Sequence, residues 1–238
     1  MKFGVLLLTC LMAGPPLWSE IRFESAESQT NLLELFTSEG CSSCPPAETW
    51  FGSLQNEAGL WKSFVPVAFH VDYWNSLGWH DRYSSPVFTR RQRVYGALWN
   101  AGSIYTPEFV LNGQEWSRTG GTPPVPSGKR PGRLRVTVGG DSTVTVRFQP
   151  LTGSRFVAHI APLTGGVTEV RAGENAGRKL RHEFVALALL SAPLESAGGG
   201  TFEAHLTLPE KLSANALAAW VSSPDDPVPL QATGGILK

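Results

Sequence analysis

The chain has 238 residues, enough for one large domain or two small ones at about 150 residues per domain. It carries 20 basic and 20 acidic side chains, and this balance argues against a protein that neutralises a run of nucleic-acid phosphates. No apolar run approaches the roughly 20 residues that a membrane-spanning helix needs, so we expect no membrane span in the mature chain. The 25 glycines and 18 prolines predict many turns and short strands.

Residues 1–19 have the pattern of a signal peptide. Lys2 gives a short positive start, residues 3–13 form an apolar run, and cleavage after Ser19 fits the small residue there. The alternative is an uncleaved N-terminal anchor. Removal of this segment predicts a periplasmic or secreted protein, in which a pair of cysteines can form a disulfide.

Strands and helices alternate in the first half of the chain, which implies right-handed crossovers and an at least partly parallel sheet. Ser85 followed by Pro86 is a good helix start, and Asn112 followed by Gly113 is a strong hairpin signal. The expected elements are a strand at 32–36, a helix with its apolar face at 47–58, a strand at 64–71, a helix from 85 to about 100, a strand at 108–112 and its partner at 114–118. The apolar side of the second helix is assigned to Val87, Phe88, Val94, Tyr95, Leu98 and Trp99.

The second half has a different pattern. Residues 122–132 are rich in proline and glycine and predict a linker between residues 27–121 and residues 133–238. Beyond it, short runs alternate apolar and polar side chains, which predicts a β-sandwich. The clearest of these runs are 134–138, 144–148, 156–160 and 202–208.

A Cys-x-x-Cys pair, Cys41 and Cys44, lies between the first predicted strand and the first predicted helix. A cysteine at a helix N-terminus faces unpaired backbone N–H groups and the positive end of the helix dipole, and both favour the nucleophilic thiolate. We expect Cys41 to be the exposed attacking residue and Cys44 the inner one that resolves a mixed disulfide. Ser42 and Ser43 offer hydroxyl donors to the thiolate, whereas the Glu39 carboxylate opposes a second negative charge.

A Thr-Pro step precedes the apolar strand at 108–112. Thioredoxin-like folds place a cis-proline at this point, and a cis bond would turn the backbone of Tyr105 and Thr106 toward the cysteines. There it could pair with an extended substrate segment. We therefore assign Tyr105, Thr106 and Pro107 to substrate binding. Zinc knuckles also use Cys-x-x-Cys but need a second ligand pair, which the sequence lacks. An inert local disulfide is the remaining alternative.

A third polar group, with His70, Asp72 and Trp74, lies at the end of the strand at 64–71. His70 and Asp72 would share one strand face, so they are candidate accessory residues, as an acid–base pair or as metal ligands. The alternatives are a buried structural histidine, or a copper or zinc site shared with the cysteines. The polar segment 171–178 is expected to be a loop that joins two sandwich strands.

Four segments resemble the bacterial family catalogued as domain of unknown function 1223. They read LELFTSEGCSSCPPAE, AFHVDYWNSLGWHDRYSSPVFTRRQ, SIYTPEFVLNG and RAGENAGRKLRH. The resemblance implies a thioredoxin-like domain followed by a β-rich domain, usually with a signal peptide. Family members usually continue after the Asn-Gly turn with an Ala-rich helix, which this chain lacks. A sheet face would be bare unless the C-terminal domain or a partner covers it.

The sequence thus predicts an α/β thioredoxin-like domain, a mixed sheet with flanking helices, followed by a β-sandwich-like domain. The predicted function is an exported thiol–disulfide oxidoreductase that exchanges disulfides with a protein partner through Cys41 and Cys44, with no cofactor and no metal ion. Two alternatives stay open: a non-catalytic binding module with a structural disulfide, and a Cys/His metal-handling protein. No feature of the sequence indicates an oligomeric state.

Overall fold

The computed structural model describes residues 20–117, 122–210 and 212–237. The predicted signal peptide at 1–19 lies outside them. Within these ranges the chain forms two α-helices, two short 3-10 helices and thirteen strands. None of the helices described is long and apolar enough to cross a membrane.

Every element predicted between residues 32 and 118 is present. The helices are α1 (Pro45–Ser53), η1 (Leu54–Asn56), η2 (Asn75–Leu77) and α2 (Pro86–Leu98). The first strands are β1 (Ile21–Glu24), β2 (Asn31–Thr37), β3 (Phe64–His70), β4 (Glu108–Leu111) and β5 (Gln114–Glu115). The later strands are β6 (Gly132–Val138), β7 (Thr143–Pro150), β8 (Phe156–Glu169), β9 (Lys179–Ala186), β10 (Leu190–Gly198), β11 (Thr201–Thr207), β12 (Ala216–Ser223) and β13 (Asp226–Ile236). Residues 122–131 hold neither helix nor strand.

The fold class expected from the sequence is wrong. The strands of residues 133–238 do not form a sandwich apart from a helix-flanked sheet, because β9 pairs in parallel with β3 as well as antiparallel with β8. The result is one mixed sheet of thirteen strands, with the two short helices packed on it. Its strand order is β1-β6-β7-β11-β10-β8-β9-β3-β2-β4-β5, with β12 paired to β8 and β13 paired to β12.

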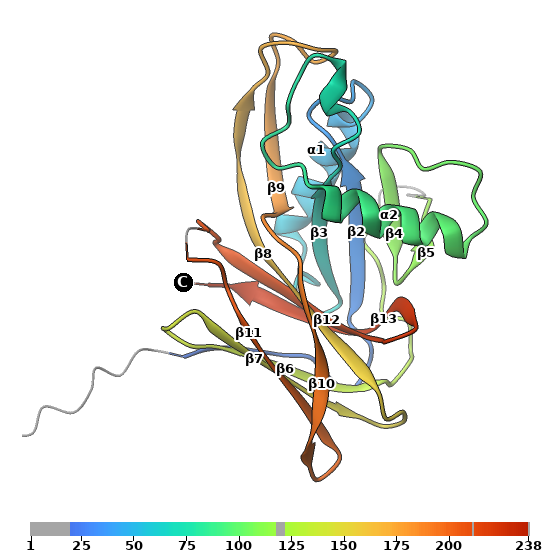
Figure 1. Cartoon of the computed structure of the whole chain (residues 1–238), viewed down its shortest axis with the longest axis vertical. Coiled ribbons are helices and arrows are strands. Elements are labelled where there is room, and N and C mark those ends of the chain that lie inside the picture. The colour runs from blue at the N-terminus through green and yellow to red at the C-terminus, as the bar shows by residue number, and fades with distance from the viewer. Residues whose placement is uncertain (1–19, 118–121, 211, 238) are drawn as a thin grey trace, which may run out of the picture.

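The long strand β8 joins the two parts of the sheet. It pairs with β10 and β12 near its start and with β9 near its end, so that it runs from the lower part of the molecule to the upper part (Figure 1). Alternation of apolar and polar residues stops after Ile160 because the next three residues are buried on both faces. The register then shifts between Thr164 and Gly166. The sequence pattern therefore revealed only the first five of its fourteen residues.

The central strands β2 and β3 are buried along their whole length. They pair in parallel, with Leu32 opposite Val65 and Phe36 opposite Phe69. The helix α1 packs Phe51 against one side of this pair. On the other side lie α2 and the C-terminal strands, the latter contributing Ala218, Trp220 and Ala232. The strands β12 and β13 thus pack on the central strands. The sequence had not shown whether the C-terminal part of the chain or a partner protein covers that face of the sheet.

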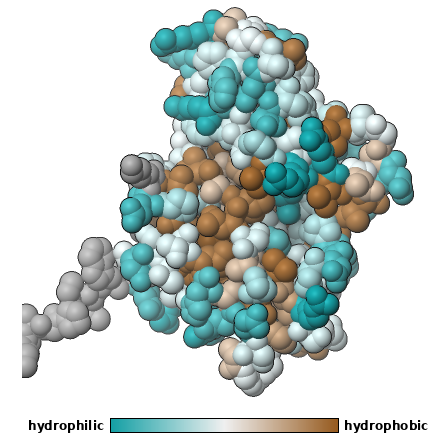
Figure 2. Space-filling model, in the orientation of Figure 1, coloured by the Kyte–Doolittle hydropathy of each residue, from teal (hydrophilic) through white to brown (hydrophobic). Residues whose placement is uncertain are grey.

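One face of α2 differs from the prediction. Phe88 and Tyr95 are buried against the sheet as expected. Val87, Val94 and Leu98 are 39%, 42% and 48% exposed, so these three do not belong to the core-facing side. Figure 2 shows hydrophobic residues over α2 and across the middle of the same face of the molecule.

Candidate functional site

Cys41 and Cys44 form a disulfide at the start of α1. Their Cα atoms are 5.4 Å apart, and the backbone N–H of Cys44 donates to the carbonyl oxygen of Cys41 at 3.2 Å. Cys44 is the N-cap residue of α1, and Pro45 is the first helical residue. The predicted placement of the pair between a strand and a helix is therefore confirmed, since β2 ends only four residues before Cys41.

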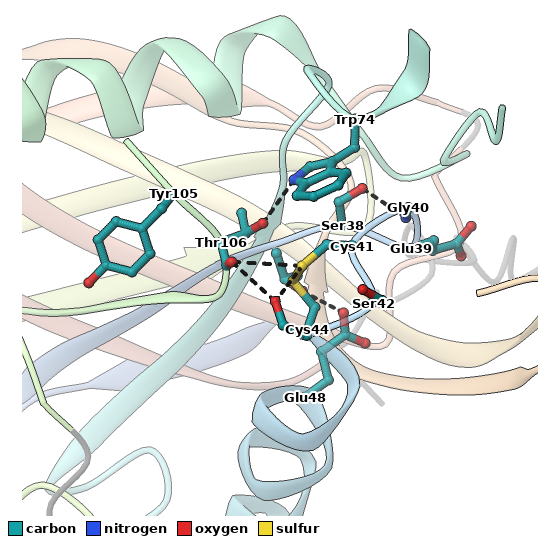
Figure 3. Close-up of a disulfide and its surroundings, with 12 residues drawn as sticks. Ser38, Glu39, Gly40, Cys41, Ser42, Cys44, Glu48, Trp74, Tyr105 and Thr106 are labelled. Carbon is teal, nitrogen blue, oxygen red and sulfur yellow. Dashed lines mark hydrogen bonds between the residues drawn. A yellow bond between two sulfur atoms is a disulfide. The ribbon is translucent and has the colours of Figure 1, made fainter. Parts of the chain in front are cut away.

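The Thr106–Pro107 bond is cis, as predicted, and it lies beside the disulfide. The carbonyl oxygen of Thr106 is 3.7 Å from the Sγ of Cys41 (Figure 3). The hydroxyl of Ser43 lies 3.3 Å from the same sulfur and donates to the Thr106 carbonyl oxygen at 3.5 Å. A backbone acceptor and a side-chain hydroxyl thus both reach Cys41.

Trp74 covers this arrangement. Its indole N–H donates to the Thr106 hydroxyl at 2.8 Å, and in Figure 3 the ring lies on the side of the disulfide away from α1. Both cysteines are 0% exposed. The expectation that Cys41 is exposed is therefore wrong for the oxidised protein. A partner sulfur reaches Cys41 only if side chains that cover it move.

Tyr105 points away from the disulfide (Figure 3). Its hydroxyl donates to the Glu115 carboxylate, and its carbonyl oxygen accepts from the Gln92 amide at 2.7 Å. The hydrogen bond to Glu115, together with burial, raises the pKa of Tyr105 to about 12. Of the three residues assigned to substrate binding, the structure brings Thr106 and Pro107 to the cysteines and leaves the Tyr105 side chain outside.

The loop between β8 and β9 holds the cysteine loop in place. The buried Asn175 amide donates to the carbonyl oxygens of Glu39 and Cys41, each at 2.9 Å. The Glu174 carboxylate accepts from the backbone N–H of Ser42 at 3.1 Å, and hydrogen bonding from the Ser42 side chain, together with this backbone hydrogen bond, lowers the pKa of Glu174. The segment 171–178 is therefore part of the site and does more than join two strands. Its glycines and polar residues mark a loop, but nothing local in the sequence indicates its partner.

Replacing Asn175 by alanine should lower the free energy of unfolding by about 1–3 kcal/mol, because two buried carbonyl oxygens lose their donor. Urea unfolding followed by tryptophan fluorescence measures the change. Glu174→Gln is the matched control, since it alters the exposed neighbour, and its effect should stay within about 0.5 kcal/mol. Equal stabilities of the two variants would contradict a holding role for Asn175.

The sequence suggested that His70 pairs with Asp72, but the structure does not show this pair. The strand β3 ends at His70, so its alternation does not extend to Asp72, whose carboxylate accepts from the Thr89 hydroxyl at 2.5 Å. The partner of His70 is Asp81, with Nδ1 to Oδ2 at 2.7 Å. Both side chains are buried. Burial opposes the ionised form of Asp81, but the charge of His70 outweighs it and lowers the pKa of Asp81 to about 2.

A second histidine, His182 of β9, lies next to this pair, with the two imidazole centroids 5.1 Å apart. Its Nδ1 is 2.6 Å from Glu48 of α1, and its Nε2 is 3.2 Å from Glu39. Burial lowers the pKa of His182, but hydrogen bonds to the two carboxylates outweigh it and raise this pKa to about 9. Neither Glu48 nor His182 is recognisable as a site residue from the sequence, because they come from elements far apart in the chain.

Glu39 turns away from the disulfide. Its carboxylate accepts from the Trp79 indole N–H at 2.8 Å and faces His182 on the other side. Burial acts to raise the pKa of Glu39, but the contact with His182 outweighs it and the pKa is lowered. The predicted repulsion between Glu39 and a Cys41 thiolate is thus reduced by the positive charge of His182, which lies against the same carboxylate.

Comparisons with known proteins show the family of the chain and a likeness of fold. Residues 32–222 match the family described as protein of unknown function (DUF1223). A structural-genomics crystal structure of a protein from Agrobacterium tumefaciens is 21% identical, with a TM-score of 0.62 over 90% of this chain and 96% of that one. The structure of HBP35 of Porphyromonas gingivalis is 15% identical, with a TM-score of 0.58 over 89% of this chain and 76% of that one. At such identities the likeness concerns the fold alone. No curated protein matches the chain.

Proposed function

From the disulfide site we propose that this chain, which belongs to the DUF1223 family, is an exported thiol–disulfide oxidoreductase. The supporting observation is the Sγ of Cys41, which lies in the turn that precedes α1, three residues before the N-cap Cys44, with the Thr106 carbonyl and the Ser43 hydroxyl against it. An extended protein segment that replaces Trp74 next to Thr106 would bring its own sulfur to Cys41. The signal-peptide pattern of residues 1–19 supports an oxidising compartment, periplasmic or extracellular.

The exchange balances within the two sulfur pairs. The Cys41 thiolate attacks a partner disulfide, so that a Cys41–partner bond forms and the partner's second sulfur leaves as a thiolate. The Cys44 thiolate then attacks Cys41, restores the disulfide and releases the partner's first sulfur. Two electrons pass to the partner, which ends as a dithiol after it takes up two protons. The reverse sequence oxidises a partner dithiol.

One observation favours a second candidate, a structural disulfide in a non-catalytic binding module. Both cysteines are fully buried. The Asn175 amide holds the cysteine loop through the Cys41 carbonyl oxygen, and Trp74 is held by its hydrogen bond to the Thr106 hydroxyl. A bond enclosed in this way is a poor target for an external thiol. Reactivity and reduction potential separate the two candidates, because a structural disulfide resists reduction more strongly.

The test measures each thiol of the reduced protein. Alkylation rates between pH 5 and 10, with mass spectrometry to assign the label, should give Cys41 an apparent pKa below the value of about 8.5 for a free cysteine. Equilibration with dithiothreitol and glutathione buffers should give a reduction potential between about −270 and −120 mV. Slow, equal alkylation of Cys41 and Cys44, or a potential below about −300 mV, would assign the bond a structural role.

A further inference from the structure

Three buried side chains from three different elements converge on one point behind the disulfide. They are Glu48 of α1, His70 at the end of β3 and His182 of β9. One nitrogen or oxygen atom from each lies within 4.8 Å of those from the other two. This set of side chains is called the Glu-His-His cluster below.

Each member of the cluster has a second polar atom that a neighbouring residue holds. The outer contacts are two hydrogen bonds, His70 Nδ1 with Asp81 at 2.7 Å and Glu48 Oε1 with the Thr37 hydroxyl at 2.5 Å, and one ion-pair contact, His182 Nε2 with Glu39 at 3.2 Å, which lacks hydrogen-bond geometry. The remaining polar atoms of the three side chains face one another: His70 Nε2, His182 Nδ1 and Glu48 Oε2. Metal-binding histidines usually have this arrangement, in which a carboxylate holds the nitrogen that does not bind the metal.

His70 Nε2 has no hydrogen-bond partner, although the side chain is completely buried. Nearly all buried polar groups in folded proteins have a partner, so the exception needs an explanation. Water does not provide one, because the space that the cluster encloses with Leu35, Phe51 and Ala68 has no room for a water molecule. A metal ion bonded to this nitrogen would satisfy it.

The charge around the cluster also favours a cation. Three carboxylates, those of Glu39, Glu48 and Asp81, are buried within contact of the two histidines. Buried carboxylates are costly unless positive charge lies close by. A divalent ion held by the two histidines and Glu48 would supply positive charge at this point.

We propose that Glu48, His70 and His182 bind one divalent transition-metal ion, with Zn²⁺ as the best match. Imidazole nitrogens and carboxylate oxygens are common ligands of zinc in proteins. The ion would replace the proton shared between Glu48 and His182, which are now 2.6 Å apart. The site differs from a Cys/His site, because Cys41 and Cys44 are bonded to each other. The proposal does not rest on the redox function.

The test uses the full chain with its disulfide intact. Because the cluster is buried, the protein is unfolded in guanidinium chloride and refolded either with EDTA or with ZnCl₂, and free metal is removed. We expect one Zn²⁺ per chain and a higher melting temperature for the zinc sample. Refolding with CoCl₂ should give a visible spectrum without a thiolate-to-cobalt band.

Variants identify the ligands. Glu48→Gln and His182→Gln should lose the bound zinc, whereas the exposed His205→Gln is the matched control and should keep it. Asp81→Asn, which changes the carboxylate behind His70, should weaken zinc binding by about 10–100-fold. The double variant Cys41→Ser/Cys44→Ser should bind zinc like the natural chain. Circular dichroism establishes that each variant is folded.

Either of two results would overturn the proposal. One is a refolded natural chain that holds no zinc after free metal is removed. The other is zinc that depends on the two cysteines, seen as its loss from the double cysteine variant or as a thiolate band in the cobalt spectrum. Both measurements on the natural chain remain decisive if Glu48→Gln or His182→Gln fails to fold.

Discussion

Replacing Arg91 by leucine should lower the free energy of unfolding by about 3–5 kcal/mol. The reason is Glu34, a fully buried carboxylate in the middle of β2. One of its oxygens accepts from Arg91 Nε at 2.5 Å, and the other accepts from the Tyr95 hydroxyl at 2.7 Å. The variant would leave the carboxylate without its counter-charge in a strand that is buried along its whole length. Urea unfolding measures the loss.

Two further variants make this expectation specific. Arg90→Leu, at the exposed position next to Arg91 on the same helix, should change stability by no more than about 0.5 kcal/mol. The double variant Glu34→Leu/Arg91→Leu should recover most of the loss, because apolar replacement of a whole buried ion pair is often neutral or stabilising. An Arg91→Leu protein as stable as Arg90→Leu would show that Glu34 does not need its partner.

Cys41→Ser should abolish disulfide exchange, and Cys44→Ser should trap the partner as a mixed disulfide. The first variant removes the attacking sulfur beside Thr106. The second keeps the attack but removes the sulfur that releases the partner. Exchange is measured as the reduction of a protein disulfide by the reduced chain, and the trapped species is seen by non-reducing electrophoresis and mass spectrometry.

The folded state provides the control for both cysteine variants. The disulfide spans only three positions in the chain and closes a very short loop, so its removal should have a small effect on unfolded-state entropy. Neither variant should unfold, and loss of exchange then reports chemistry. Trapping by Cys41→Ser and not by Cys44→Ser would reverse the assigned roles. Full exchange by Cys41→Ser would end the proposed mechanism.

The parts of the fold that were predictable depend on local physics. Apolar runs marked β2, β3 and β4, and the Ser85 hydroxyl accepts from the backbone N–H of Val87 at 3.3 Å, as its capping pattern implied. The cysteine pair and the cis bond before Pro107 followed from their positions relative to these elements. The strand, helix-cap and cysteine inferences used residues within a few positions of one another, whereas the cis bond was expected from an analogy with thioredoxin-like folds.

The rest depended on contacts that local patterns do not encode. The strand β12 is buried on both faces for seven of its eight residues, so it shows no alternation and was not predicted. The pairing of β9 with β3 brings Val185 to Ala68, and no periodicity in either strand indicates the other. Asn175 and His182 reach the site through this pairing, which is why the sequence analysis placed the segment 171–178 away from the cysteines.

The late position of β9 in the chain has a consequence for the order of events during synthesis. The two cysteines are three positions apart and can meet as soon as they emerge. Asn175, which holds their loop, follows Cys41 by 134 positions, and contacts of such separation form late because a long loop must first close. The disulfide can therefore form before the β8–β9 hairpin encloses it. The same disulfide is thus exposed in the nascent chain and buried in the folded protein.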